Sequence, residues 1–167
     1  MIYLQPGEVC VSDRPGSIVT VLGSCLAVTM WVPRLGIGAI CHSYLPHCSN
    51  RMTCRSQCRE RFKYVHCTIP WMIEMLSRND IRPSELEIKL FGGGHLAASL
   101  QEPADTIQVG QQNAATAMEI LKQTGLTVTS QDLGGFMGRK LIFNTGNGEV
   151  LVKKIRQRVI KDSNRLH

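Results

Sequence analysis

Cys25 and His42 are the two residues whose types and spacing most favour chemistry. They lie in two strand-like segments, 25–32 and 36–45, with Pro33 and Arg34 between them. Proline at this position favours a turn, so the segments predict a β-hairpin. In a hairpin centred there, opposed residues have numbers that sum to about 67, as those of Cys25 and His42 do. Opposed side chains lie on one face with Cβ atoms about 4.5–5.5 Å apart, so the imidazole can take the thiol proton.

The residues before Cys25 strengthen this interpretation. Gly23 permits a sharp entry into the strand and leaves backbone N–H groups near the sulfur, where they can stabilise a thiolate or an oxyanion. Thr20, on the preceding strand, can orient the imidazole as the third member of a triad. Two alternatives stay open. Cys25 can be a small buried hydrophobe, and a register slip of one residue would turn His42 to the opposite face.

The elements that must position these residues form one domain. With 167 residues, 43% of them hydrophobic and 19% charged, the chain is typical of a globular domain rather than a disordered one. Residues 1–155 are assigned to that domain, and helices are expected over about 68–80 and 111–123, with a loop over 99–108. Thr68 is the expected N-cap of the first helix. The predicted class is α/β, close to α+β, with layered mixed sheets flanked by these two main helices. The expected strands are 17–22, 25–32, 36–45, 86–91, 126–130, 141–144 and 150–155.

Residues 47–67 differ from the rest of the domain. They lack apolar periodicity, are basic, and are predicted to form a loop-like insert. The spacing of the four cysteines is unlike that of a paired Cys-x2-Cys site, yet four thiolates can bind a structural zinc ion. A redox-sensitive disulfide and an ordered basic loop are the alternatives. The candidate zinc ligands are Cys48, Cys54, Cys58 and Cys67.

The net charge of +6 is concentrated in two places, the insert and the C-terminal tail of residues 156–167 with the strand before it. A basic tail is usually solvated, so no specific nucleic-acid binding is predicted. No apolar run reaches the ~18–20 residues of a transmembrane helix, and the N-terminus does not resemble a secretory signal. A cytoplasmic protein with reduced thiols is therefore expected.

Longer motifs resemble the chemoreceptor glutamine deamidase family CheD. The segments 20–28 and 36–46, which contain Gly-Ser-Cys25 and His42-Ser-Tyr-Leu-Pro46, carry the resemblance most specifically. It continues through Lys89-Leu-Phe-Gly-Gly-Gly94, Val109-Gly-Gln-Gln-Asn113, Asp132-Leu-Gly-Gly135 and Gly138-Arg-Lys140, in the same order and at similar spacing. The similarity covers nearly the whole chain except residues 47–62 and the basic tail.

The resemblance implies a cysteine-hydrolase fold related to deamidating toxins, with a Cys–His–Thr triad at Cys25, His42 and Thr20. The implied reaction hydrolyses glutamine side-chain amides of methyl-accepting chemotaxis receptors to glutamate and ammonia, through a cysteine thioester and without a required cofactor. Hydrolysis of receptor methyl esters is a side activity of some members. A CheC-type phosphatase of the response regulator is the implied partner.

Two positions depart from the family pattern: Gln112 stands where an arginine is common, and Gly94-His95 replaces Ala-Asn. Both departures bear on which substrate or partner the protein prefers more than on the hydrolysis reaction itself. The alternative function is a binding module that engages receptors and the phosphatase, with the insert as a metal or redox element. A pure binding module would not need Cys25, His42 and Thr20 together.

Overall fold

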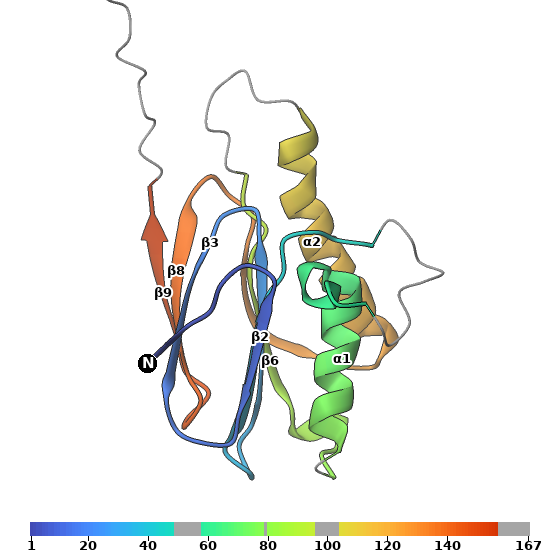
Figure 1. Cartoon of the computed structure of the whole chain (residues 1–167), viewed down its shortest axis with the longest axis vertical. Helices are drawn as coiled ribbons and strands as arrows, with labels where there is room; N and C mark the ends of the chain where they lie inside the picture. Colours follow the sequence, from blue (N-terminus) through green and yellow to red (C-terminus); the bar gives the residue numbers. More distant parts are fainter. Residues whose placement is uncertain (49–57, 79, 96–103, 157–167) are drawn as a thin grey trace, which may run out of the picture.

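The structure is a computed structural model that describes residues 1–48, 58–78, 80–95 and 104–156. These residues form three layers, with a four-stranded sheet stacked on a five-stranded sheet and helices on the far side of the latter (Figure 1). The sequence prediction of an α/β protein with layered mixed sheets and two main helices is confirmed.

The four-stranded sheet has the order β1-β3-β8-β9. The five-stranded sheet has the order β2-β5-β4-β6-β7, and its β6–β7 pair is parallel. The bounds are β1 Ile2–Tyr3, β2 Glu8–Ser12, β3 Ser17–Leu22, β4 Leu26–Val32, β5 Ile37–His42, β6 Glu87–Gly92, β7 Val128–Leu133, β8 Gly138–Asn144 and β9 Val150–Ile155. The helices are α1 Val65–Ser77 and α2 Ala104–Gln123, with short 3-10 turns η1 at Arg61–Lys63 and η2 at Pro83–Glu85.

Apolar side chains from alternate positions of β4 and β5 fill both sides of the five-stranded sheet. Ala27 and Ile40 face the four-stranded sheet, where they meet Ile18, Leu141 and Phe143. Their neighbours in the two strands belong to the core beneath the helices, which includes Val28, Met30, Cys41, Ile69, Met72 and Leu121. Because successive strand side chains point to opposite faces, one hairpin contributes to both cores.

The hairpin of β4 and β5 forms as predicted, but its register is shifted by two residues. Leu26 pairs with Ser43, and Thr29 pairs with Ile40. The turn is longer than expected, because the N–H groups of both Leu35 and Gly36 donate to the Val32 carbonyl at 3.2 and 2.9 Å. Direct opposition of Cys25 and His42 was therefore wrong. A shift of two keeps every side chain on its predicted face, since the strand repeat is two residues.

Both helices begin earlier than predicted. Helix α1 starts at Val65, so the last residues of the expected 47–67 insert are helical, and the Thr68 hydroxyl donates to the Tyr64 carbonyl within the helix at 2.8 Å instead of capping it. The Val65 N–H donates to the Leu45 carbonyl at 2.8 Å, a tertiary contact that places the helix start and has no local signal.

Helix α2 starts at Ala104, within the segment predicted as a loop. Gly110 lowers the local helix propensity, which explains the prediction. A Cβ atom at Gly110 would lie 2.8 Å from the Gly93 carbonyl oxygen, so this glycine allows the helix to pack closely on the segment after β6. Packing therefore outweighs propensity here. Strands β1 and β2 were not predicted at all.

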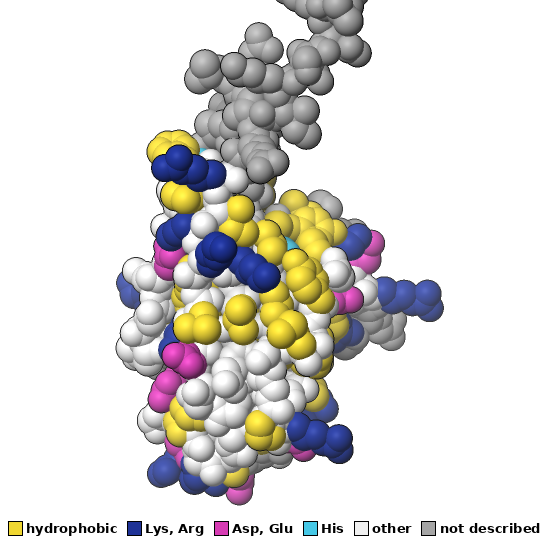
Figure 2. All heavy atoms as spheres, turned by 90° about the vertical axis from the view of Figure 1, so that its left-hand side faces the viewer, with side chains coloured by type: hydrophobic (Ala, Val, Ile, Leu, Met, Phe, Trp, Pro, Cys, Tyr) yellow, Lys and Arg dark blue, Asp and Glu magenta, His cyan; other side chains and the backbone are white. Residues whose placement is uncertain are grey.

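The outer face of the four-stranded sheet carries no further layer among the described residues. Figure 2 shows hydrophobic side chains gathered across this face, beside Lys and Arg side chains. Tyr3, Val21 and Leu151 are exposed there. None of the described helices is long and apolar enough to cross a membrane.

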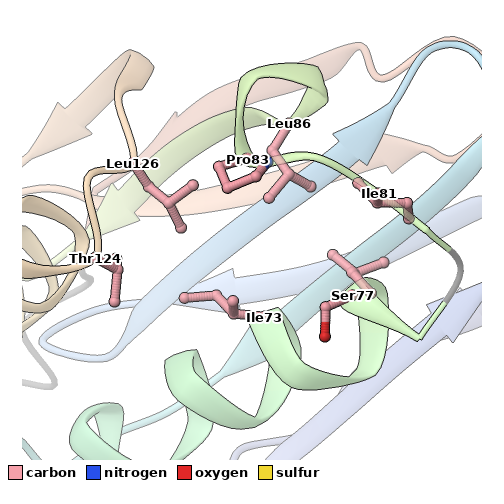
Figure 3. Close-up of a pocket in the computed structure, with 8 residues that line it drawn as sticks. Ile73, Ser77, Ile81, Pro83, Leu86, Thr124 and Leu126 are labelled. Atoms are coloured by element: carbon pink, nitrogen blue, oxygen red, sulfur yellow. The ribbon is translucent and has the colours of Figure 1, made fainter.

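An apolar pocket of about 140 Å³ lies between the C-terminal ends of α1 and α2. Figure 3 shows Ile73 and Ser77 of α1, Pro83 and Leu86 around η2, and Leu126 after α2 pointing toward it. Strand β6 begins beside this pocket, after Leu86, and ends at Gly92. The pocket is thus at the opposite end of β6 from the site described next.

Candidate functional site

Thr20 and His42 form a buried hydrogen-bonded pair between the two sheets. The Thr20 Oγ1 atom lies 2.7 Å from His42 Nδ1 and 2.9 Å from the Leu4 carbonyl oxygen. The carbonyl can only accept, so the single hydroxyl proton of Thr20 goes to Leu4. His42 must then donate from Nδ1 to Thr20. This assigns the neutral imidazole a proton on Nδ1 and leaves the Nε2 lone pair free for a base.

Burial lowers the pKa of His42 to about 4, although the Leu4 carbonyl and the Glu8 carboxylate act in the opposite direction. The imidazole is therefore neutral at pH 7. Its Nε2 atom is buried and has no hydrogen-bond partner among the described residues. A buried ring nitrogen without a partner is costly and is often found where a ligand or reacting group completes the bond.

Cys25 lies on the same face of the sheet as His42. Leu26 and Ser43, the next residues along the two strands, exchange backbone hydrogen bonds of 2.8 and 2.9 Å. Cys25 and His42 are therefore diagonal neighbours, for which Cβ separations near 7–8 Å or somewhat less are usual. Cys25 packs against the core between the sheets, whereas Cys41 is buried in the core beneath the helices. The two cysteines therefore lie on opposite faces of the sheet, as the two-residue repeat of a strand predicts.

The Cys25 thiol is partly exposed, and burial raises its pKa above the ordinary value, while the backbone N–H groups of Gly23 and Cys25 oppose this. With a raised thiol pKa and a lowered imidazole pKa, the resting pair is thiol and neutral imidazole rather than thiolate and imidazolium. Proton transfer then accompanies attack on a substrate, and the two backbone amides can stabilise the charge that develops.

Asn113 of α2 connects the two strands that carry the pair. Its side-chain amide Nδ2 donates to the Ser24 carbonyl at 3.1 Å and to the Tyr44 carbonyl at 3.2 Å. Ser24 precedes Cys25, and Tyr44 follows His42 by two residues. Asn113 is fully buried, so both bonds form away from water, where a donor is costly to leave unpaired.

The glycines after β6 pack directly behind the cysteine. The Gly93 N–H donates to the Cys25 carbonyl and the Gly94 N–H to the Gly23 carbonyl, both at 2.9 Å. Gly92 has a φ of +112°, and a Cβ atom there would overlap the Cys25 carbonyl oxygen. These glycines therefore allow the two backbone segments to approach closely.

Replacing Gly92 with alanine is expected to lower the free energy of unfolding by about 3 kcal/mol or more, because steric overlap adds to an unfavourable φ. Gly125→Ala is the matched control. Its φ is also positive, at +71°, but a Cβ atom there meets nothing within 4 Å. Urea unfolding of both variants provides the test, and an equal loss in the two would contradict the packing argument.

Three of the expected zinc ligands, Cys48, Cys58 and Cys67, belong to the part of the chain that the structure describes, whereas Cys54 lies outside it. Within the described ranges, no three His, Cys, Asp or Glu side chains gather in a metal-binding group. Because one of the four ligands is not described, the structural zinc stays a prediction.

Three contributors to the site escaped the sequence analysis. These are the Leu4 carbonyl, the Asn113 amide and the Arg139 guanidinium, which anchors the turn between β7 and β8. A backbone carbonyl has no sequence signal. The polar residues Asn113 and Arg139 stood in motifs, but their full burial was not visible from spacing.

The fold and site define an α/β protein with two stacked sheets, in which an anchored neutral histidine and a partly exposed cysteine share one face of a hairpin. A family model described as "CheD chemotactic sensory transduction" matches residues 45–154. The chain belongs to the CheD family.

Curated relatives match over almost their whole length. One from Maridesulfovibrio salexigens, named "Probable chemoreceptor glutamine deamidase CheD", is 35% identical over 92% of this chain and 91% of its own. A Geobacter sulfurreducens relative, "Probable chemoreceptor glutamine deamidase CheD 2", is 39% identical over 92% and 89%. One from the archaeon Methanococcus maripaludis, with the same name as the first, is 33% identical over 92% and 94%.

Among solved structures, the Bacillus licheniformis hypothetical protein YfiH is similar, with a TM-score of 0.46 and 12% identity. The match covers 77% of this chain and 49% of that one.

Proposed function

We propose that this protein is a chemoreceptor glutamine deamidase that converts receptor glutamines to glutamate and ammonia through a cysteine thioester. The observation that carries the proposal is the Thr20–His42 pair, whose free Nε2 is on the same sheet face as Cys25. The names of the relatives supply the substrate class.

The reaction follows from the groups present. His42 Nε2 takes the Cys25 thiol proton as the sulfur bonds to the glutamine carbonyl carbon. The backbone N–H groups of Gly23 and Cys25, which lower the pKa of the thiol, are the proposed donors to the resulting oxyanion. Nε2 then gives its proton to the amide nitrogen, the C–N bond breaks and ammonia leaves a thioester. Water, deprotonated by the same nitrogen, attacks the thioester, and the thiol and a glutamate are released.

The decisive experiment incubates the protein with a purified receptor cytoplasmic fragment and follows ammonia together with the mass of each peptide. Each converted glutamine gains about 1 Da, because an amide NH₂ is replaced by OH. The binding-module alternative predicts complex formation without any mass change. Receptor fragments that keep every glutamine, despite forming the complex, would overturn the deamidase proposal.

Thr20→Val is expected to slow deamidation on the order of 10²-fold, because the imidazole loses the hydroxyl that holds its orientation and tautomer. Thr20→Ser retains the hydroxyl and is expected to keep most of the rate. Ammonia release by the two variants tests this, with circular dichroism as the check on folding. A folded valine variant with the wild-type rate would remove Thr20 from the proposed triad.

Several finer expectations remain predictions. They are the binding of a CheC-type phosphatase, a methylesterase side activity and a cytoplasmic location. The same receptor fragment, prepared with methylated glutamates, tests the second by methanol release.

A further inference from the structure

Phe136 is an exposed aromatic residue in a turn next to the glycine segment that contacts Cys25. It is 79% exposed, more than any other large hydrophobic side chain among the described residues except Met1. It lies in the turn that joins β7 to β8. A single exposed apolar residue is ordinary on a protein surface, so its meaning depends on how the turn is held and what lies beside it.

The turn is anchored by a buried arginine. Arg139 is only 1% exposed, and its guanidinium donates to the Gly134 carbonyl at 2.6 Å, the Met137 carbonyl at 3.2 Å and the Asp132 carboxylate at 2.9 Å. Gly134 and Gly135 both have φ values in the left-handed region, +71° and +72°, which glycine adopts readily. The phenyl group is therefore presented from a fixed backbone rather than from a loosely held loop.

The same turn is tied to the cysteine through the glycine segment after β6. The Gly134 N–H donates to the Gly92 carbonyl at 2.9 Å, and the His95 N–H donates to the Gly135 carbonyl at 2.7 Å. On its other side this segment bonds the carbonyls of Gly23 and Cys25. The point where a Cβ atom would stand on Gly94 is 3.1 Å from the Gly23 oxygen and 3.3 Å from the Gly135 oxygen. The Phe136 turn and the cysteine loop thus contact one short segment from opposite sides.

We propose that Phe136 is a docking residue for the substrate protein, packing on an apolar side chain that lies next to the target glutamine. The inference rests on the proposed function and adds a feature of the substrate to it. A folded protein that brings a glutamine to the partly exposed Cys25 also brings its neighbouring surface close to the turns beside the cysteine, and the Phe136 turn is bonded to the same glycine segment as Cys25. A pre-positioned aromatic group loses little conformational entropy when it packs on such a surface, which is why aromatic residues dominate binding energy at interfaces.

The Phe136 ring also lies beside the His95 ring, with centroids 5.8 Å apart. The apolar contact and this neighbouring imidazole belong to one surface, and the partner that fits it is an apolar side chain flanked by polar groups.

The test measures binding of the receptor cytoplasmic fragment in a Cys25→Ala background, so that turnover does not interfere. Phe136→Ala is expected to weaken binding about tenfold. Phe136→Leu, which keeps an apolar side chain, should recover most of the affinity. Leu151→Ala is the matched control, because Leu151 is 55% exposed but lies on β9, on the outer face of the other sheet. With Cys25 restored, Phe136→Ala should raise KM about tenfold and leave kcat unchanged.

The outcomes separate this inference from the proposed function. Equal binding by the Phe136→Ala and Leu151→Ala chains would overturn the docking role. So would a fall in kcat at constant KM, which would indicate that Phe136 acts on the site's geometry. Binding that depends on Phe136 would support the docking role. If the protein with Cys25 intact then released no ammonia, the proposed deamidase activity would be overturned. A parent chain that does not bind the fragment at all overturns the inference.

Discussion

Cys25→Ser is expected to lower the rate of glutamine deamidation by on the order of 10³-fold or more, because an alcohol is far less readily deprotonated than a thiol. The His42 imidazole, with a pKa of about 4, is a weak base and cannot compensate for this difference. Serine is close to cysteine in size, so the fold should be retained. Ammonia release from a receptor fragment is the measurement.

Cys10→Ser is the matched control for this substitution. Cys10 is also partly exposed, lies on β2 of the same sheet, and packs against the same core between the sheets. It is expected to have the wild-type rate. If the Cys25→Ser and Cys10→Ser proteins had equal rates of deamidation, Cys25 would not be the nucleophile.

His42→Asn is the second substitution with a large expected effect, a loss of on the order of 10²–10⁴-fold in rate, the usual contribution of a general acid–base group. Asparagine has no basic nitrogen that could take the thiol proton or return it to the leaving amide. His66→Asn, at an exposed position of α1, is the control and should leave the rate unchanged. A His42→Asn protein that keeps the wild-type rate would require a different base.

The pH dependence sharpens the same prediction. Only the neutral imidazole is a base, so kcat/KM of the wild type should stay level at mildly acidic pH and fall as pH drops through about 4. An acidic limb near the ordinary histidine pKa of 6.5 would show that the burial of His42 does not set its protonation in solution.

Stability should change with pH for the same reason. The pKa of His42 is about 4 in the folded chain and near 6.5 when unfolded, so the unfolded chain binds more protons between these values. His42 therefore makes the free energy of unfolding decrease as pH falls from 6.5 toward 4. Urea unfolding at several pH values should show a shallower decrease for His42→Asn than for His66→Asn.

Much of this site could be inferred from local sequence patterns. Pro33 and the two apolar segments around it predict a hairpin, and the two-residue repeat of a strand then assigns Cys25 and His42 to one face and Cys41 to the other. That assignment tolerates the observed shift of two residues in register. An error of one residue would have reversed it, and only the length of the turn decides between these cases.

The elements that the sequence analysis did not predict are those that depend on contacts with residues far away in the chain. Strand β1 has two residues and no pattern of its own, yet it brings the Leu4 carbonyl to Thr20. Helix α2 approaches the segment after β6 closely at Gly110, a contact between residues far apart in the chain. Local propensity carries no information about either contact.

The amino-acid sequence alone thus determined which side chains can react, because this follows from residue type. It also determined which face of a strand they occupy, because this follows from the two-residue repeat. The tertiary structure decided how those groups are tuned. The Leu4 carbonyl sets the proton on Nδ1, burial between two sheets lowers the pKa of His42, and Asn113 joins the Ser24 and Tyr44 carbonyls. Each of these effects depends on a contact between residues far apart in the chain, and the spacing of residues in a sequence does not specify such contacts.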